Sequence, residues 1–148
     1  MDFMKQRGME METNQDIQLN KIRQDFETSP FFQLLGFRLI KLTEEEVTLE
    51  LPVEEKLLNT HGSLHGGVYA TIIDNIISLK LRSEIGLPVV TVDLNIQYIA
   101  EVKSGKVVAK ARTYGNGRKI KMGEGEVFDG EGNLLAKGTG TFKATKRR

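Results

Sequence analysis

One long apolar segment decides the fold of this chain: residues 67–85, which read GVYATIIDNIISLKLRSEI. Its apolar residues fall on more than one face of a helix, so this helix should be buried on most sides. A stop signal follows at once in Gly86-Leu87-Pro88, because glycine ends helices and proline cannot continue them. The sequence therefore predicts a central helix that other elements must surround.

Segments with the alternating pattern of β-strands lie on both sides of this helix. The expected strands span residues 37–42, 47–53, 90–98, 107–112, 120–128 and 134–142, with turn residues between consecutive strands on the same side of the helix. Runs of strands joined by short turns form antiparallel sheets. The predicted class is α+β, an antiparallel sheet wrapped around one long helix.

Two pairs of alternating glycines support the wrapped arrangement. Gly123 and Gly125 share one face of a strand, and Gly138 and Gly140 share one face of the next. Such positions let a helix approach closely or let the sheet bend.

The N-terminal segment differs from the rest. Residues 1–15 are polar and patternless and are expected to be disordered, whereas residues 16–28 show helical spacing and 31–36 a short helical turn. A chain of 148 residues is the size of one domain with one core, which we place at residues 16–148.

The composition excludes several functions. A net charge of +1 offers no field for nucleic acid or an anionic membrane, and no apolar run is long enough to span a membrane. The absence of cysteine excludes disulfides, thiolate zinc sites and cysteine nucleophiles. The first residues lack the apolar core of a signal peptide, so a cytoplasmic location is expected.

An aspartate interrupts the apolar helix. Asp74 stands between Ile72-Ile73 and Ile76-Ile77, and a carboxylate in apolar surroundings costs free energy unless it is paired, hydrogen-bonded or protonated. No cation lies three or four positions away along the helix. Asp74 is therefore either a structural aspartate that hydrogen-bonds across an interface or a catalytic carboxylate.

Glycines and both histidines of the chain stand at the entrance of this helix. N–H groups at a helix start point outward, and Gly66-Gly67 would let a developing oxyanion approach them closely; a flexible entrance loop is the alternative. His61 and His65 lack a third metal ligand, and Ser63 lies in no nucleophile elbow. A metal site and a serine hydrolase are both disfavoured.

The spacing between these two features indicates two chains. Gly66 and Asp74 are separated by about 12 Å along a helix at 1.5 Å per residue. An oxyanion donor and a catalytic carboxylate must each lie within about 3 Å of one substrate. Antiparallel helices of two chains can bring the entrance of one to the middle of the other, so a catalytic Asp74 predicts a dimer with two shared sites.

The combined motif resembles a known family. Three pieces carry the resemblance: His65-Gly66-Gly67, Asp74 in the buried helix, and residues 90–95, VTVDLN. Together they look like the hotdog-fold acyl-CoA thioesterases, especially the phenylacetate-degradation branch, over residues 30–143. The resemblance implies the hotdog fold and hydrolysis of an acyl- or aryl-CoA thioester to the free acid and CoA. It implies no metal and no cofactor beyond the coenzyme A of the substrate.

The resemblance also implies a role for each matching residue. Asp74 corresponds to the catalytic carboxylate, as general base on water or as nucleophile, and Gly66 to the residue whose N–H polarises the thioester carbonyl. Asn59 corresponds to a residue that holds the water or the carbonyl, with His65 supporting that geometry, and Thr91 to a water-holding hydroxyl. In the family Asn59 and Gly66 come from one subunit, and Asp74 and Thr91 come from its partner, in a homodimer that often pairs into a homotetramer.

Further residues are candidates for binding the substrate. Coenzyme A phosphates need cations, and Arg118 and Lys119 stand at the start of a strand near the expected cleft, with Arg82 and Arg112 as weaker candidates. Surface solvation is the alternative for each. Gly67 and Tyr69, at the start of the helix, are expected to line the substrate pocket.

Strand periodicity conflicts with the role implied for Thr91, since it alternates with Val90 and Val92 and so faces away from them and from Leu94. Two other functions are also open. A non-catalytic acyl-CoA sensor on the same fold would usually carry a DNA-binding segment and lack the acid. A hotdog dehydratase or hydratase would need its own arrangement of Asp and His.

Overall fold

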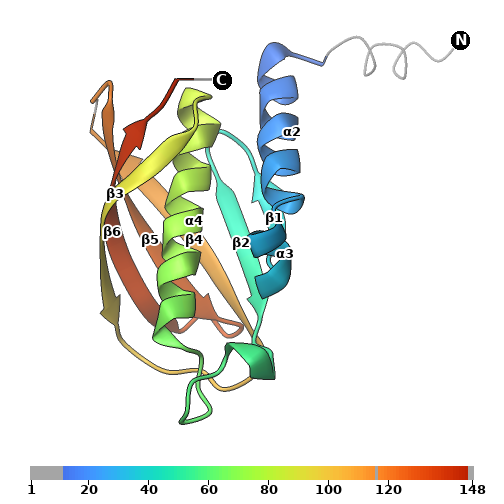
Figure 1. Ribbon diagram of the computed structural model, residues 1–148, viewed down its shortest axis with the longest axis vertical. Helices are drawn as coiled ribbons and strands as arrows, with labels where there is room; N and C mark the ends of the chain where they lie inside the picture. Colours follow the sequence, from blue (N-terminus) through green and yellow to red (C-terminus); the bar gives the residue numbers. More distant parts are fainter. Residues whose placement is uncertain (1–11, 116, 147–148) are drawn as a thin grey trace, which may run out of the picture.

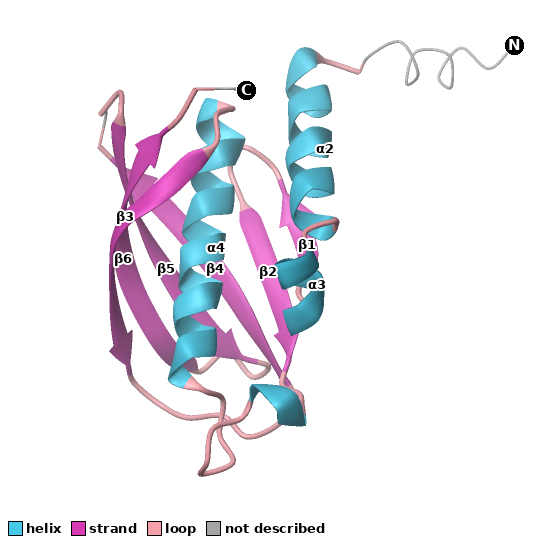
Figure 2. Cartoon of the chain, viewed as in Figure 1, coloured by secondary structure: helices cyan, strands magenta, loops and turns pink. Residues whose placement is uncertain are grey.

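A six-stranded antiparallel sheet curves around one long helix (Figure 1, Figure 2). The computed structural model describes residues 12–115 and 117–146. In chain order the elements are α2 (Asn14–Glu27), α3 (Pro30–Leu35), β1 (Arg38–Leu42), β2 (Val47–Pro52), the 3-10 turn η1 (Glu55–Leu57), α4 (Gly66–Ile85), β3 (Val89–Tyr98), β4 (Lys106–Tyr114), β5 (Ile120–Asp129) and β6 (Leu134–Ala144).

The helix α4 connects two strands that are far apart in the sheet, β2 and β3. The strands are ordered β1-β2-β4-β5-β6-β3, and every neighbouring pair is antiparallel. The chain leaves β2, crosses the face of the sheet as α4, and returns at the far edge as β3 beside β6 (Figure 1). The predicted α+β architecture is therefore confirmed, and β1 and β3 are its two edge strands.

The core forms where α4 meets the glycines of the sheet. Ile73, Ile76 and Ile77 are completely buried, and burial of each stabilises the fold by about 1.5–3 kcal/mol. A Cβ added at Gly125 would lie 3.1 Å from a methyl of Ile76 and 3.3 Å from one of Ile73. The predicted role of this glycine, to let the helix approach the sheet, is borne out.

The edge strand β3 carries a β-bulge that determines which side chains reach the helix. Its register against β6 slips between Thr91 and Asp93, which leaves Val92 as an extra residue. The extra residue shifts the alternation by one position, so Thr91 lies on the α4 side together with Leu94 and Ile96, which pack against the core. The sequence periodicity, which separated Thr91 from Leu94, was wrong at this point because the bulge was not visible in it.

The helix α2 begins two residues earlier than its apolar pattern indicates. Thr13 accepts a hydrogen bond from the Asp16 N–H while the Asp16 carboxylate accepts one from the Thr13 N–H, which is a capping box. Of the segment 1–15 that we expected to be disordered, residues 1–11 lie outside the described residues, and residues 14 and 15 belong to α2.

The helix α2 lies alongside α4 and β1 (Figure 1). Ile22 is buried, and the Arg23 guanidinium donates to the Leu39 carbonyl of β1 at 3.0 Å. No helix in the described part of the chain is both long and apolar enough to cross a membrane.

Candidate active site

The Asp74 carboxylate lies halfway along α4, on the side that faces β3. Thr91 Oγ1 donates a hydrogen bond to Asp74 Oδ1 at 2.6 Å, the length expected when a hydroxyl donates to a carboxylate. Asp74 is half-buried, and among the described residues no cation pairs with it and no donor reaches its second oxygen. The carboxylate is held by one hydroxyl and keeps one oxygen available for a reacting group.

The two glycines at the start of α4 differ in whether their N–H groups donate a hydrogen bond. His65 caps the helix, and its Nδ1 accepts from the Gly67 N–H at 2.8 Å, which leaves the ring proton on Nε2. The Gly66 N–H has no acceptor within residues 12–115 and 117–146. Of the two, Gly66 therefore offers the free donor at the positive end of the helix.

Asn59 shapes the loop that leads to this helix. Its side-chain oxygen accepts from the backbone N–H groups of His61 at 2.8 Å and Ser63 at 3.1 Å, and its amide nitrogen donates to the Ser63 hydroxyl at 3.1 Å. His61 is exposed. Across the described ranges, no three His, Cys, Asp or Glu side chains gather as ligands for a metal ion.

A tyrosine at the end of β3 contacts the helix entrance and could not be found from the sequence. The Tyr98 hydroxyl donates to the Gly66 carbonyl oxygen at 2.8 Å. In the sequence Tyr98 reads only as the last member of an alternating strand, and a backbone acceptor leaves no trace in residue type.

Tyr69, an expected pocket residue, belongs to the core. It is only 3% exposed, and its ring meets that of Tyr98 edge to face with centroids 5.7 Å apart. Burial raises the pKa of Tyr69 to about 12. The Tyr69 hydroxyl is buried and has no hydrogen-bond partner among the residues that the structure describes.

The expected phosphate contacts lie on the hairpin between β4 and β5. Arg118 and Lys119 are exposed, and neither forms an ion pair with a described residue. A row of paired residues, Ile120, Lys143 and Val90, connects the base of this hairpin to the start of β3. The two cations therefore lie at the same end of the sheet as Thr91 and the start of β3.

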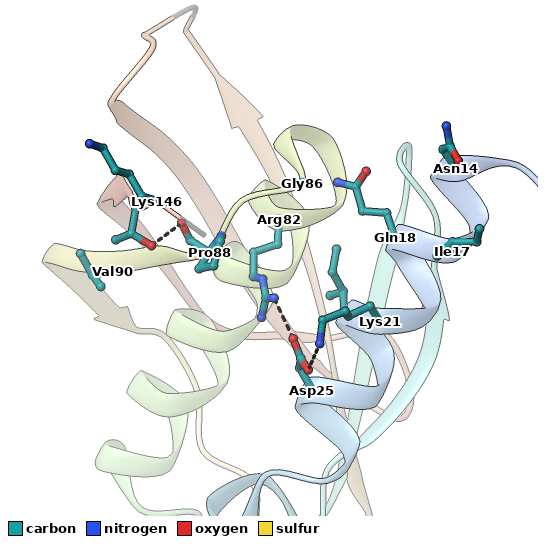
Figure 3. Close-up of a pocket in the computed structure, with 12 residues that line it drawn as sticks. Asn14, Ile17, Gln18, Lys21, Asp25, Arg82, Gly86, Pro88, Val90 and Lys146 are labelled. Atoms are coloured by element: carbon teal, nitrogen blue, oxygen red, sulfur yellow. Dashed lines mark hydrogen bonds and ion pairs between the residues drawn. The ribbon is translucent and has the colours of Figure 1, made fainter. Parts of the chain in front are cut away.

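A cavity of about 790 Å³ lies elsewhere, between α2 and the C-terminal end of α4 (Figure 3). In it the Asp25 carboxylate accepts from Arg82 at 3.1 Å and from Lys21 at 3.3 Å. Burial alone would raise the pKa of Asp25, but these hydrogen bonds outweigh it and hold that pKa below its ordinary value. Because Arg82 also lies over the Phe26 ring, it serves to fix α2 against α4.

The predicted site residues thus form two clusters in one chain. The acid cluster, Asp74 with Thr91, lies in the middle of α4, and the entrance cluster, Gly66 with His65 and Asn59, lies at its start. About 12 Å of helix separates them, so the two clusters lie at different places along α4.

Comparison with known proteins gives this arrangement a context. Residues 61–136 match the thioesterase superfamily. Acyl-coenzyme A thioesterase 13 from Homo sapiens is 35% identical over 115 residues, which cover 75% of this chain and 82% of that protein.

Solved structures agree with the sequence comparison. Thioesterase superfamily member 2 from zebrafish superposes with a TM-score of 0.77 at 30% identity, over 86% of this chain and 98% of that one. A mutant of the phenylacetic acid degradation protein PaaI from Thermus thermophilus gives 0.73 at 27% identity, over 79% of this chain and 100% of that one. The chain belongs to the thioesterase superfamily, and its sheet wrapped around α4 is the hotdog fold of these enzymes.

Proposed function

We propose that this protein hydrolyses acyl-CoA thioesters to the free acid and coenzyme A, with Asp74 as the residue that activates water. The observation that carries the proposal is the 2.6 Å hydrogen bond from Thr91 to Asp74, which orients a carboxylate in an otherwise apolar helix. The relatives named acyl-coenzyme A thioesterase 13 and phenylacetic acid degradation protein support the same substrate class.

The reaction follows from the two clusters. The free oxygen of Asp74 takes a proton from a water molecule, whose oxygen attacks the thioester carbonyl carbon. The Gly66 N–H donates to the carbonyl oxygen as it becomes an oxyanion. Collapse of this intermediate breaks the carbon–sulfur bond, and the thiolate of coenzyme A leaves and takes up the proton that Asp74 removed from water, which restores the carboxylate. No step requires a metal ion.

We further propose that each site is shared between two copies of the chain. The strand β3 is an edge with exposed valines, Val90 and Val92, and such edges pair readily with another strand. It carries Thr91 at one end, beside Asp74, and Tyr98 at the other, beside Gly66. Antiparallel pairing of two β3 strands would therefore place the entrance cluster of one copy next to the acid cluster of the other.

The remaining substrate contacts follow from this geometry. Arg118 and Lys119 form no ion pair with a described residue and lie at the Thr91 end of the sheet, so they would meet the phosphates of coenzyme A. We place the reaction in the cytoplasm, with which the cysteine-free composition is compatible.

Substitution of Asp74 tests the proposal directly. Asp74→Asn keeps the size of the side chain and its bond to Thr91 but removes the base, so kcat for acyl-CoA hydrolysis should fall by about 10²- to 10⁴-fold. Asp16→Asn, the same chemical change on the exposed start of α2, should leave kcat unchanged. Release of free thiol measures both rates. Near-wild-type turnover by a folded Asp74→Asn protein would refute the assignment of Asp74 as the catalytic base.

Product analysis separates the alternatives. A wild-type protein that binds acyl-CoA tightly and releases no thiol would be a sensor, and one that hydrates enoyl-CoA without releasing thiol would be a hydratase. The proposal requires free acid and free coenzyme A in equal amounts.

A further inference from the structure

We infer that Tyr98 is a positioning residue of this site: its hydroxyl holds the Gly66–Gly67 peptide and so limits the backbone rotation at Gly66 that would turn the Gly66 N–H away from the thioester carbonyl. The inference rests on the proposed function and adds a residue that the family motif does not contain.

A single peptide unit at the helix entrance is held at both of its polar atoms. The carbonyl oxygen of Gly66 accepts from the Tyr98 hydroxyl at 2.8 Å, and the N–H of Gly67 donates to His65 Nδ1 at 2.8 Å. Glycine has more backbone freedom than any other residue. Rotation of this peptide would break both bonds, so the two side chains restrict the backbone angles at Gly66 and thereby the direction of its N–H.

Gly66 and Tyr98 also fit each other in space. A Cβ added at Gly66 would lie 3.3 Å from the Tyr98 hydroxyl oxygen and 3.4 Å from the ring carbon that bears it. The tyrosine therefore lies directly against the glycine, closer than most side chains at that position would allow. A side chain at this position would require the Tyr98 ring to move by a few tenths of an ångström.

The exposure of Tyr98 argues against a purely structural role. Its side chain is 57% exposed in the single chain, so the fold of that chain does not need this hydrogen bond to satisfy a buried group. By contrast, the Tyr69 hydroxyl beneath it is buried without a partner among the described residues. The exposed Tyr98 hydroxyl has a defined acceptor, the Gly66 carbonyl oxygen. Gly66 is also the residue whose N–H is the proposed oxyanion donor.

The first experiment compares Tyr98→Phe with Tyr114→Phe. Tyr114 lies at the end of β4 and is exposed, so its substitution removes the same hydroxyl at a position outside the site. Loss of a whole oxyanion donor lowers kcat by about 10²- to 10³-fold. Misdirection of a donor that remains should lower kcat for Tyr98→Phe by about 10-fold, and KM should rise by no more than the several-fold loss of carbonyl binding. Tyr114→Phe should match the wild type.

The second experiment isolates the carbonyl contact by measuring the affinity for two inert substrate analogues. One analogue keeps the carbonyl and replaces the sulfur with a methylene, and the other keeps the sulfur and replaces the carbonyl with a methylene. Tyr98→Phe should weaken binding of the ketone by several-fold and leave binding of the thioether unchanged. Equal weakening of both would overturn the inference, because it would show a general loss of structure or of substrate contact.

The failure of this inference can be told apart from failure of the proposed function. If the wild type releases no thiol from acyl-CoA, the function itself is wrong. If the wild type is active, Asp74→Asn is inactive, and Tyr98→Phe retains full kcat and full ketone affinity, then the function stands and the role of Tyr98 is refuted.

Discussion

Gly66 is the first helical residue of α4, a position where the backbone N–H can be removed without breaking the helix. Proline is tolerated there because its N–H would have no partner in the helix and its fixed φ suits the first turn. The residue before a proline must be extended, and His65 already has φ −64 and ψ 137. Gly66→Pro therefore removes the proposed oxyanion donor while leaving α4 intact.

We expect Gly66→Pro to lower kcat by about 10²- to 10³-fold, with thermal stability and helix content close to those of the wild type. Gly66→Ala is the matched control, because it crowds Tyr98 with a Cβ but keeps the N–H, and it should retain most of the activity. Steady-state kinetics and circular dichroism provide the measurements. An equal loss in both variants would attribute the effect to crowding and refute the donor.

Tyr69 should contribute to stability in a pH-dependent way. Burial raises the pKa of Tyr69 from 10.0 to about 12. Above pH 10 the Tyr69 hydroxyl ionises in the unfolded chain, while in the folded chain it stays protonated up to about pH 12. The free energy of unfolding should therefore fall as pH rises from about 10 to about 12, by roughly 2 to 3 kcal/mol. Tyr69→Phe removes this loss and also a buried hydroxyl without a described partner, a gain of about 1 kcal/mol at neutral pH.

Denaturant melts across this pH range measure the effect. The stability of Tyr69→Phe should exceed that of the wild type by an amount that grows above pH 10, while Tyr114→Phe should follow the wild-type curve. Parallel curves for Tyr69→Phe and the wild type would contradict the assignment.

The sequence reveals candidate site residues when their type is anomalous for their place. Asp74 in an apolar helix and Gly66 at a helix start can be identified in this way, because each is costly or unusual there. The side of β3 on which Thr91 lies was not predictable, since one inserted residue at the bulge reverses the alternation. Tyr98 was not predictable either, because its partner is a backbone carbonyl.

At the scale of elements, the glycines of β5 and β6 set the distance between sheet and helix. A Cβ at Gly138 would lie 2.5 Å from the Asn95 carbonyl oxygen of β3 and 3.2 Å from a methyl of Ile73 in α4. Backbone atoms cannot rotate away as a flexible side chain can. Gly138→Ala should therefore lower the free energy of unfolding by about 1–3 kcal/mol.

Gly130 offers a matched control on the hairpin between β5 and β6. A Cβ there would meet only Lys106, at 3.8 Å, so Gly130→Ala should change the free energy of unfolding by less than about 0.5 kcal/mol. Chemical denaturation of both variants measures the difference. Equal stabilities would show that β3 and β6 are not packed as closely as described.

The elements themselves followed from hydrophobic periodicity because burial enforces it. Apolar residues alternate along β2, β5 and β6 and cover several faces of α4, as the packing of these elements requires. The bounds of the four elements lie within one or two residues of the predicted ones. Hydrophobic periodicity did not predict the start of α2, because the hydrogen bonds between Thr13 and Asp16 define it and no apolar residue marks it.

At the scale of the whole molecule, the proposed sites should be complete only between two chains. Asp74 and Thr91 are joined within one chain, whereas Gly66 lies about 12 Å further along α4. A dimer formed from one Asp74→Asn chain and one Gly66→Pro chain would then contain one site with both defects and one site with neither. Two inactive proteins should restore activity when their subunits exchange.

Random exchange of equal amounts should give about a quarter of wild-type activity, because half of the dimers are mixed and each has one intact site of two. The measurement is the rate of thiol release after the two variants are unfolded and refolded together. Asp74→Asn mixed with Thr91→Val is the control: both changes fall in the same half of the site, so no mixed dimer contains an intact site. If the first mixture recovers no more activity than this control, each site lies within one chain, and Gly66 is not the donor that acts with Asp74.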